Sequence, residues 1–124
     1  MTLSGRAAIE PPFRVRREDT GVVAVLVVEG EVDLVTAPAL QLELESIAPG
    51  CDVVVDLCET PFLDSNGLSV LLAATRARDG RVHIACVPGG PVRRLLEVAQ
   101  GASEILKPYE SRRDALAALE AYRR

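Results

Sequence analysis

Aromatic side chains are scarce in this chain, which has no tryptophan, two phenylalanines and two tyrosines among 124 residues. A core built around aromatic rings is therefore excluded. The 48% of residues that are apolar must fill the interior mainly as valine, leucine and alanine. A chain of this length forms one domain with a continuous core, and this composition is typical of an α/β domain.

Long apolar runs are also missing. No run approaches the roughly 20 residues that a membrane-spanning helix needs, and the opening MTLSGRAAIEPPF has no apolar stretch of signal-peptide length. We therefore expect a cytoplasmic protein without a membrane partner. Residues 1–12 are small and polar and end in two prolines, so we expect a flexible arm before a single domain at 13–124.

The chain also lacks an excess of positive charge and the residue spacing of a metal-binding motif. The formal net charge of -4 argues against nucleic-acid binding through phosphate contacts and favours protein partners. The three cysteines, Cys51, Cys58 and Cys86, form no CxxC pair, and no second cluster supplies metal-ligand spacing. Reduced thiols and no metal site are expected.

Motifs of the common enzyme classes are not found. There is no GxGxxG, GxxxxGK[ST] or HExxH. The segment GLSVL lacks the second glycine of a nucleophile elbow, and its Ser69 falls inside an expected helix. The single histidine, His83, lies in an alternating strand pattern, which is typical of a structural residue. We expect no catalytic residue and no enzymatic activity.

Apolar strands and helix-spaced leucines alternate along the rest of the chain. Strands are expected at 13–19, 22–30, 52–58, 81–87 and 103–109, and helices at 37–47, 64–78, 92–99 and 111–122. Thr36 is expected to cap the first helix, and Ser111 the last through the pattern SRRD. The order predicts an α/β fold, a mostly parallel mixed sheet flanked by about four helices.

The polar cluster LDSNGL stands between the strand at 52–58 and the following helix. Asp64 or Ser65 can cap that helix by accepting its first N–H groups, and Gly67 permits close approach to its first turn. Capping alone explains such a cluster. It also fits a phosphorylation switch, because a phosphate on Ser65 would add about -1.5 to -2 charges at the positive end of the helix dipole.

Segments from three regions of the chain together resemble the STAS family, and within it the stand-alone anti-sigma factor antagonists, or anti-anti-sigma factors. They are GEVDLVTAPAL, VVVDLCETPFLDSNGLSVLL, and VRRLLEVAQ with ILKPYESRRDAL. The middle segment combines a strand ending in Asp-Leu, a hydrophobic-Asp-Ser-x-Gly turn and a leucine-rich helix. The resemblance spans about residues 13–122 and implies the STAS fold.

The resemblance also implies a partner-switching cycle. The unphosphorylated antagonist would bind an anti-sigma factor that is also an ATP-dependent serine kinase, which releases a sigma factor for transcription. The kinase would phosphorylate Ser65 and end the complex, and a metal-dependent serine phosphatase would restore it. ATP and Mg²⁺ belong to the kinase in this family, so the chain is expected to need no cofactor.

The family's site residues transfer to matching positions only. Ser65 is the expected phosphoacceptor. The expected partner-binding residues flank the two polar motifs: Asp33, Thr36, Asp64, Asn66, Gly67 and Leu68. By local pattern, Asp33 is equally well explained as a residue that starts a loop, and Asp56 is expected to cap the end of its strand.

Two alternatives keep the fold and change the switch. Cys58 and Cys86 lie near the ends of strands that the topology could make neighbours, about 4.8 Å apart, which permits a disulfide if the side chains face each other. A redox switch would then replace Ser65, although buried cysteines are commonly inert packing residues. The module could also be a scaffold without any switch, which would tolerate both Ser65→Ala and Ser65→Glu.

A response-regulator receiver is the alternative from another class. VLVVEGEVDL resembles its acidic first loop, Asp56 its phosphoacceptor and LKPY its Lys-Pro pair. Only one helix fits between Glu29 and Asp56, however, where a receiver needs a helix, a strand and a second helix. Cys86 also stands where a receiver needs Ser or Thr, so the spacing argues against this class.

Overall fold

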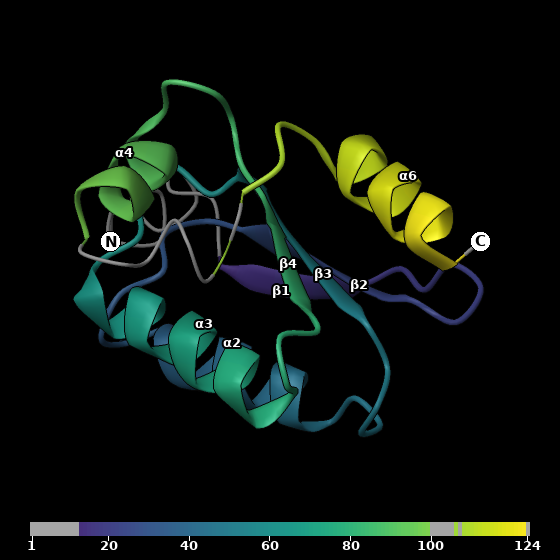
Figure 1. Cartoon of the computed structure of the whole chain (residues 1–124). Coiled ribbons are helices and arrows are strands. Elements are labelled where there is room, and N and C mark those ends of the chain that lie inside the picture. Colours follow the sequence, from purple (N-terminus) through teal and green to yellow (C-terminus); the bar gives the residue numbers. More distant parts are fainter. Residues whose placement is uncertain (1–12, 100–105, 107, 124) are drawn as a thin grey trace, which may run out of the picture.

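A computed structural model describes residues 13–99, 106 and 108–123 (Figure 1). In this part of the chain a sheet of four strands has the order β1-β2-β3-β4, with β1 antiparallel to β2 and the other neighbours parallel. The strands are β1 (Arg14–Arg17), β2 (Ala24–Glu29), β3 (Val53–Glu59) and β4 (Val82–Ala85), and the helices are α2 (Ala37–Glu45), α3 (Ser65–Ala77), α4 (Pro91–Val98) and α6 (Arg112–Arg123). The predicted mixed, mostly parallel sheet is confirmed.

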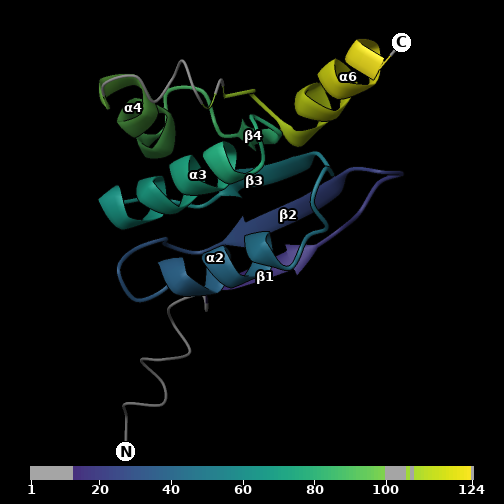
Figure 2. The ribbon, with the colours of Figure 1, turned by 60° about the horizontal axis from the view of Figure 1, so that its bottom comes forward.

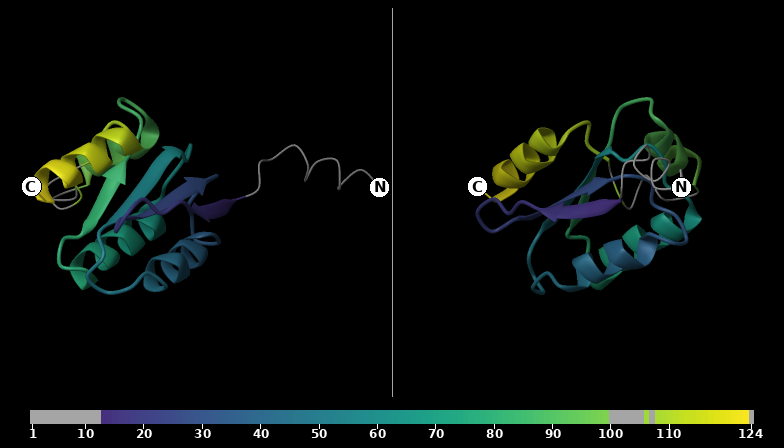
Figure 3. Two further views of the ribbon diagram at one scale, coloured as in Figure 1. Left: turned by 90° about the vertical axis from the view of Figure 1, so that its right-hand side faces the viewer. Right: turned by 180° about the vertical axis from the view of Figure 1, so that it is seen from behind.

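Helices cover both faces of the sheet. α2, α3 and α4 pack on one face, while α6 lies on the other (Figures 2 and 3). Residues of β2 alternate between the two cores: Leu26 and Val28 point toward the three helices, and Val25 and Val27 pack against α6. This double burial explains why the sequence there is continuously apolar.

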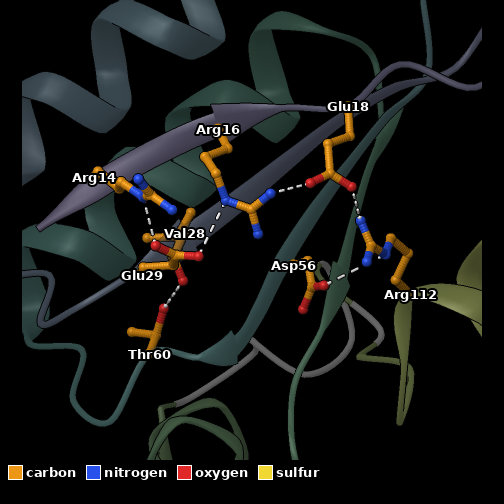
Figure 4. Close-up of polar contacts among 8 residues, drawn as sticks. All are labelled: Arg14, Arg16, Glu18, Val28, Glu29, Asp56, Thr60 and Arg112. Atoms are coloured by element: carbon orange, nitrogen blue, oxygen red, sulfur yellow. Dashed lines mark hydrogen bonds and ion pairs between the residues drawn. The ribbon is translucent and has the colours of Figure 1, made fainter.

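Ion pairs tie α6 to the sheet (Figure 4). Arg112, at the start of α6, has Nη1 2.6 Å from Glu18 Oε1 and Nε 3.7 Å from Asp56 Oδ2. Glu18 also pairs with Arg16, whose Nε lies 3.1 Å from Glu29 Oε2. The network therefore connects α6 with β1, β2 and β3, segments that are far apart in the sequence.

The expected strand at 103–109 is corrected where the structure describes it. Residues 103–105 and 107 lie outside the described residues, as does the expected arm at 1–12. Leu106 is helical and buried, and Tyr109 forms only an isolated parallel bridge with Ala85. Pro108 has no N–H to donate to a ladder, which limits pairing on that side of Tyr109. The predicted cap at Ser111 is confirmed, since its Oγ accepts the Asp114 N–H at 3.1 Å.

Candidate functional site

The loops that follow β2 and β3 meet at the carboxyl edge of the sheet. Val32 donates its N–H to the Phe62 carbonyl at 2.9 Å, and Asp64 donates its N–H to the Val32 carbonyl at 3.0 Å. Val32 and Leu63 form a bridge and are both buried. Binding loops collect at this edge of α/β sheets. The pairing brings the loop of Asp33 against the segment that leads into α3.

Asp64 is the N-cap of α3. Its Oδ1 accepts the backbone N–H of Asn66 at 2.8 Å and that of Gly67 at 3.1 Å, and the Asn66 side-chain amide reaches Oδ2 at 3.2 Å. Partial desolvation by itself raises the pKa of the Asp64 carboxyl. The bonds from Gly67 and Asn66, helped by the backbone of Leu34, outweigh it and hold this pKa below its ordinary value of 3.8.

Ser65 is the first residue of α3 and is exposed. Among the described residues, no hydrogen bond holds its hydroxyl. Asp64 already accepts the N–H groups of Asn66 and Gly67, the second and third residues of α3. The hydroxyl is therefore placed where another protein can reach it.

The other residues of the motif differ in accessibility. Asn66 is exposed, whereas Gly67 is buried and Leu68 packs, half-buried, against the main core. A Cβ atom on Gly67 would lie 2.4 Å from Leu63 Cδ1 and 2.7 Å from Val32 Cγ1. The close approach expected at Gly67 is thus made by the chain's own Leu63 and Val32 and not by a partner.

Asp33, and not Thr36, organises the start of α2. Thr36 occupies the N-cap position but makes no side-chain cap bond, because its backbone is already helical, with φ of -95° and ψ of -21°. Asp33 Oδ1 accepts the N–H groups of Val35 at 2.9 Å and Thr36 at 3.1 Å. The Thr36 hydroxyl accepts the Asp33 N–H at 2.9 Å and donates to the Glu31 carbonyl at 2.8 Å. The expected capping role of Thr36 is corrected to bracing of the loop.

Asp56 and the two candidate redox cysteines form a separate group, in which Asp56 and Cys86 are buried and Cys58 is half-buried. Asp56 Oδ1 accepts the Cys58 N–H at 2.9 Å. The expectation that Asp56 caps the end of its strand is corrected, because β3 continues past it to Glu59 and Asp56 is paired inside the sheet. Burial, together with the Asp56 carboxylate, raises the pKa of the Cys58 thiol to about 12, and burial raises that of Cys86. All three cysteines are free thiols. Since the thiolate is the reactive form, this environment disfavours oxidation of Cys58 and Cys86.

Two site features escape the sequence analysis. Leu34 and Val35 are exposed although apolar. The signal in the sequence that could have indicated this exposure is that neither residue falls on the apolar stripe of the helix expected at 37–47. The pair of Arg112 with Asp56 joins residues from opposite halves of the chain, and no local pattern indicates it.

Arrangements typical of other classes are not found in the described part of the chain. No group of three His, Cys, Asp or Glu side chains there could hold a metal ion. His83 places Nε2 3.2 Å from Asp52 Oδ1, at the amino ends of β3 and β4 and thus at the opposite edge from Ser65. Among the described helices, none has both the length and the apolar character needed to cross a bilayer.

Comparison with known proteins agrees with this architecture. The family model described as Mlab, STAS domain, matches residues 15–106. The anti-sigma-F factor antagonist RsfB of Mycobacterium tuberculosis (strain ATCC 25618 / H37Rv) is 32% identical over 96 residues, which cover 76% of this chain and 79% of RsfB. A crystal structure of an anti-sigma factor antagonist from Mycobacterium paratuberculosis shares 29% identity, with a TM-score of 0.80 over 88% of this chain and 95% of that one. SpoIIAA in its unphosphorylated form shares the fold at 16% identity, with a TM-score of 0.69 over 87% of this chain and 97% of that one.

The sheet, its two helical layers and the Asp-Ser-Asn-Gly helix start define a STAS domain. The chain belongs to the STAS-domain family of anti-sigma factor antagonists. The expectation drawn from its motif segments is confirmed at the level of family and fold.

Proposed function

We propose that this chain binds an anti-sigma factor in the cytoplasm and that phosphorylation of Ser65 ends the complex. The observation that carries the proposal is the exposed, unbonded Ser65 hydroxyl at the first position of α3, next to the loop of Asp33. Similarity to RsfB supports the antagonist role. The partner is an anti-sigma factor with an ATP-binding serine-kinase domain, and a serine phosphatase reverses the modification. The chain itself catalyses nothing and holds no cofactor.

The effect of the phosphate follows from the local charges. Asp64 lies directly before Ser65, and Asp33 lies in the adjoining loop. A phosphate adds about -1.5 to -2 charges to this acidic surface. Because Asp64 already accepts the N–H groups of Asn66 and Gly67, these two donors do not replace the water around the dianion. A partner shaped for the small hydroxyl must then desolvate a bulky dianion, which costs binding free energy.

The test uses purified anti-sigma factors that carry the kinase-type ATP-binding domain and are encoded in the genome from which this chain comes. Each is incubated with the chain, ATP and Mg²⁺, and the product is mapped by intact-mass and peptide analysis. We expect one phosphate, on Ser65. Ser69→Ala is the matched control, because Ser69 is exposed one helical turn further along α3 and should not affect the modification.

Binding measurements separate a switch from a scaffold. We expect Ser65→Ala to bind the anti-sigma factor as the unmodified chain does, and Ser65→Glu to bind at least tenfold more weakly. Equal binding by both variants, with no phosphate on Ser65, would instead indicate a scaffold. Absence of binding by the unmodified chain to every such anti-sigma factor would overturn the proposed function.

A further inference from the structure

Two adjacent apolar side chains stand out on the surface beside the site. Leu34 is 70% exposed and Val35 is 83% exposed, in the loop between β2 and α2. Neither residue joins the two buried cores. We call Leu34 and Val35 the apolar pair. Exposing two neighbouring apolar side chains is unfavourable in water, so their presence next to a candidate binding site calls for a physical explanation.

The loop holds the apolar pair in a fixed turn. Asp33 Oδ1 accepts the N–H groups of Val35 and Thr36 at 2.9 and 3.1 Å, and the Thr36 hydroxyl is bonded back to the Glu31 carbonyl at 2.8 Å. Val32, just before the turn, is buried and paired with the segment of Phe62. A partner therefore meets a backbone turn that is already ordered, which reduces the entropy lost on binding.

Acidic residues border the apolar pair near Ser65. Glu31 is exposed, Asp33 and Asp64 are half-buried, and the backbone of Leu34 contributes to the lowered pKa of the Asp64 carboxyl. The surface is thus an apolar centre with an acidic border. A complementary protein surface has an apolar recess with basic side chains at its rim.

We propose that the apolar pair anchors the anti-sigma factor and determines which anti-sigma factor this chain selects. The inference rests on the proposed function and adds the residues that supply affinity and specificity. Two roles are then divided between the loop and the start of α3. Leu34 and Val35 in the loop enter the recess of the partner, and phosphorylation of Ser65 on α3 prevents the two surfaces from meeting. Asp33 is a positioning residue, because it acts through the turn that presents the pair.

The experiment compares the double variant Leu34→Ser/Val35→Ser with Val22→Ser. Val22 is a matched control, since it is an apolar residue exposed to 60% before the amino end of β2, at the edge of the sheet opposite Ser65. Binding of each variant to the anti-sigma factor identified with the unmodified chain is measured by titration calorimetry. We expect the dissociation constant of the double variant to rise at least tenfold, about 1.4 kcal/mol, and that of Val22→Ser to stay within twofold.

Melting temperatures and sedimentation separate a loss of partner binding from a loss of folding or from self-association. Melting temperatures should be unchanged for both variants, because the substituted side chains are exposed. Undiminished binding by the double variant would overturn the inference and leave the proposed function standing, provided that Ser65→Glu still weakens binding. Sedimentation of the chain alone is also measured: self-association that disappears in the double variant would assign the apolar pair to a second copy of the chain and overturn the inference. Failure of the unmodified chain to bind would overturn the proposed function and this inference together.

Discussion

The Oδ1 atom of Asp64 accepts the backbone N–H of Gly67 at 3.1 Å, so the residue before Ser65 fixes the helix start on which Ser65 lies. The same oxygen accepts the Asn66 N–H at 2.8 Å. Stability of the fold and presentation of the candidate phosphoacceptor therefore depend on one carboxylate, and four predictions test this site and its surroundings.

Asp64→Ala should lower the melting temperature by a few degrees, because two N–H groups of the first turn lose their acceptor. Asp64→Asn is the matched control and should lose less, since asparagine is also a good N-cap. The folded-state pKa of Asp64 is depressed, so its charge stabilises the fold above about pH 4 and this contribution is lost as the pH falls through the folded-state pKa. Urea unfolding should therefore separate the original chain from Asp64→Asn at pH 7 and show a smaller difference at pH 3.

Gly67→Ala should destabilise the fold by up to about 2 kcal/mol, since the usual cost of overpacking is about 1–3 kcal/mol and a helix gain offsets part of it. The new Cβ would lie 2.4 Å from Leu63 Cδ1 and 2.7 Å from Val32 Cγ1. This strain opposes a gain of about 1 kcal/mol that alanine has over glycine inside a helix. Ser69→Ala, in the same helix, should stay within about 0.5 kcal/mol. An unfolding free energy of Gly67→Ala equal to that of the original chain would contradict the close packing of α3 on the two loops.

Arg112→Met should lower the melting temperature more than Arg113→Met does. Arg112 contacts both Glu18 and Asp56, and its loss leaves the buried Asp56 carboxylate with less compensation. Arg113 is its exposed neighbour in α6 and serves as the control. Melting curves at low and at 1 M salt complete the measurement, since screening should reduce the difference. Equal melting temperatures of the two variants would show that the ion pairs do not hold α6.

Cys58 should resist alkylation in the folded protein. Its pKa of about 12 leaves very little thiolate at pH 8. Cys86 is fully buried and should also resist. Iodoacetamide labelling followed by peptide mapping checks this, with labelling of all three cysteines in urea as the control. Rapid labelling of Cys58 at pH 8, or a Cys58 to Cys86 bond after mild oxidation, would favour the redox alternative.

Local patterns predicted much of the fold because they act over a few residues. The run 22–30 identified a strand covered on both faces, and Ser111 identified the start of α6. The LDSNGL cluster predicted a capped helix and left open whether Asp64 or Ser65 is the cap; Asp64 is. Thr36 shows where such reasoning stops, because its hydroxyl bonds to Glu31 and Asp33 within the preceding loop and not to the helix.

The amino-acid sequence by itself determined the family, the exposed helix start at Ser65 and the order of strands and helices outside 103–109, since periodicity, capping and a contiguous motif are local properties. Only the tertiary structure decided that Gly67 faces Val32 and that Arg112 meets Asp56. It also decided that Leu34 and Val35 remain in solvent. These relationships depend on which strands pair and in which register, and that is settled by contacts between segments far apart in the chain.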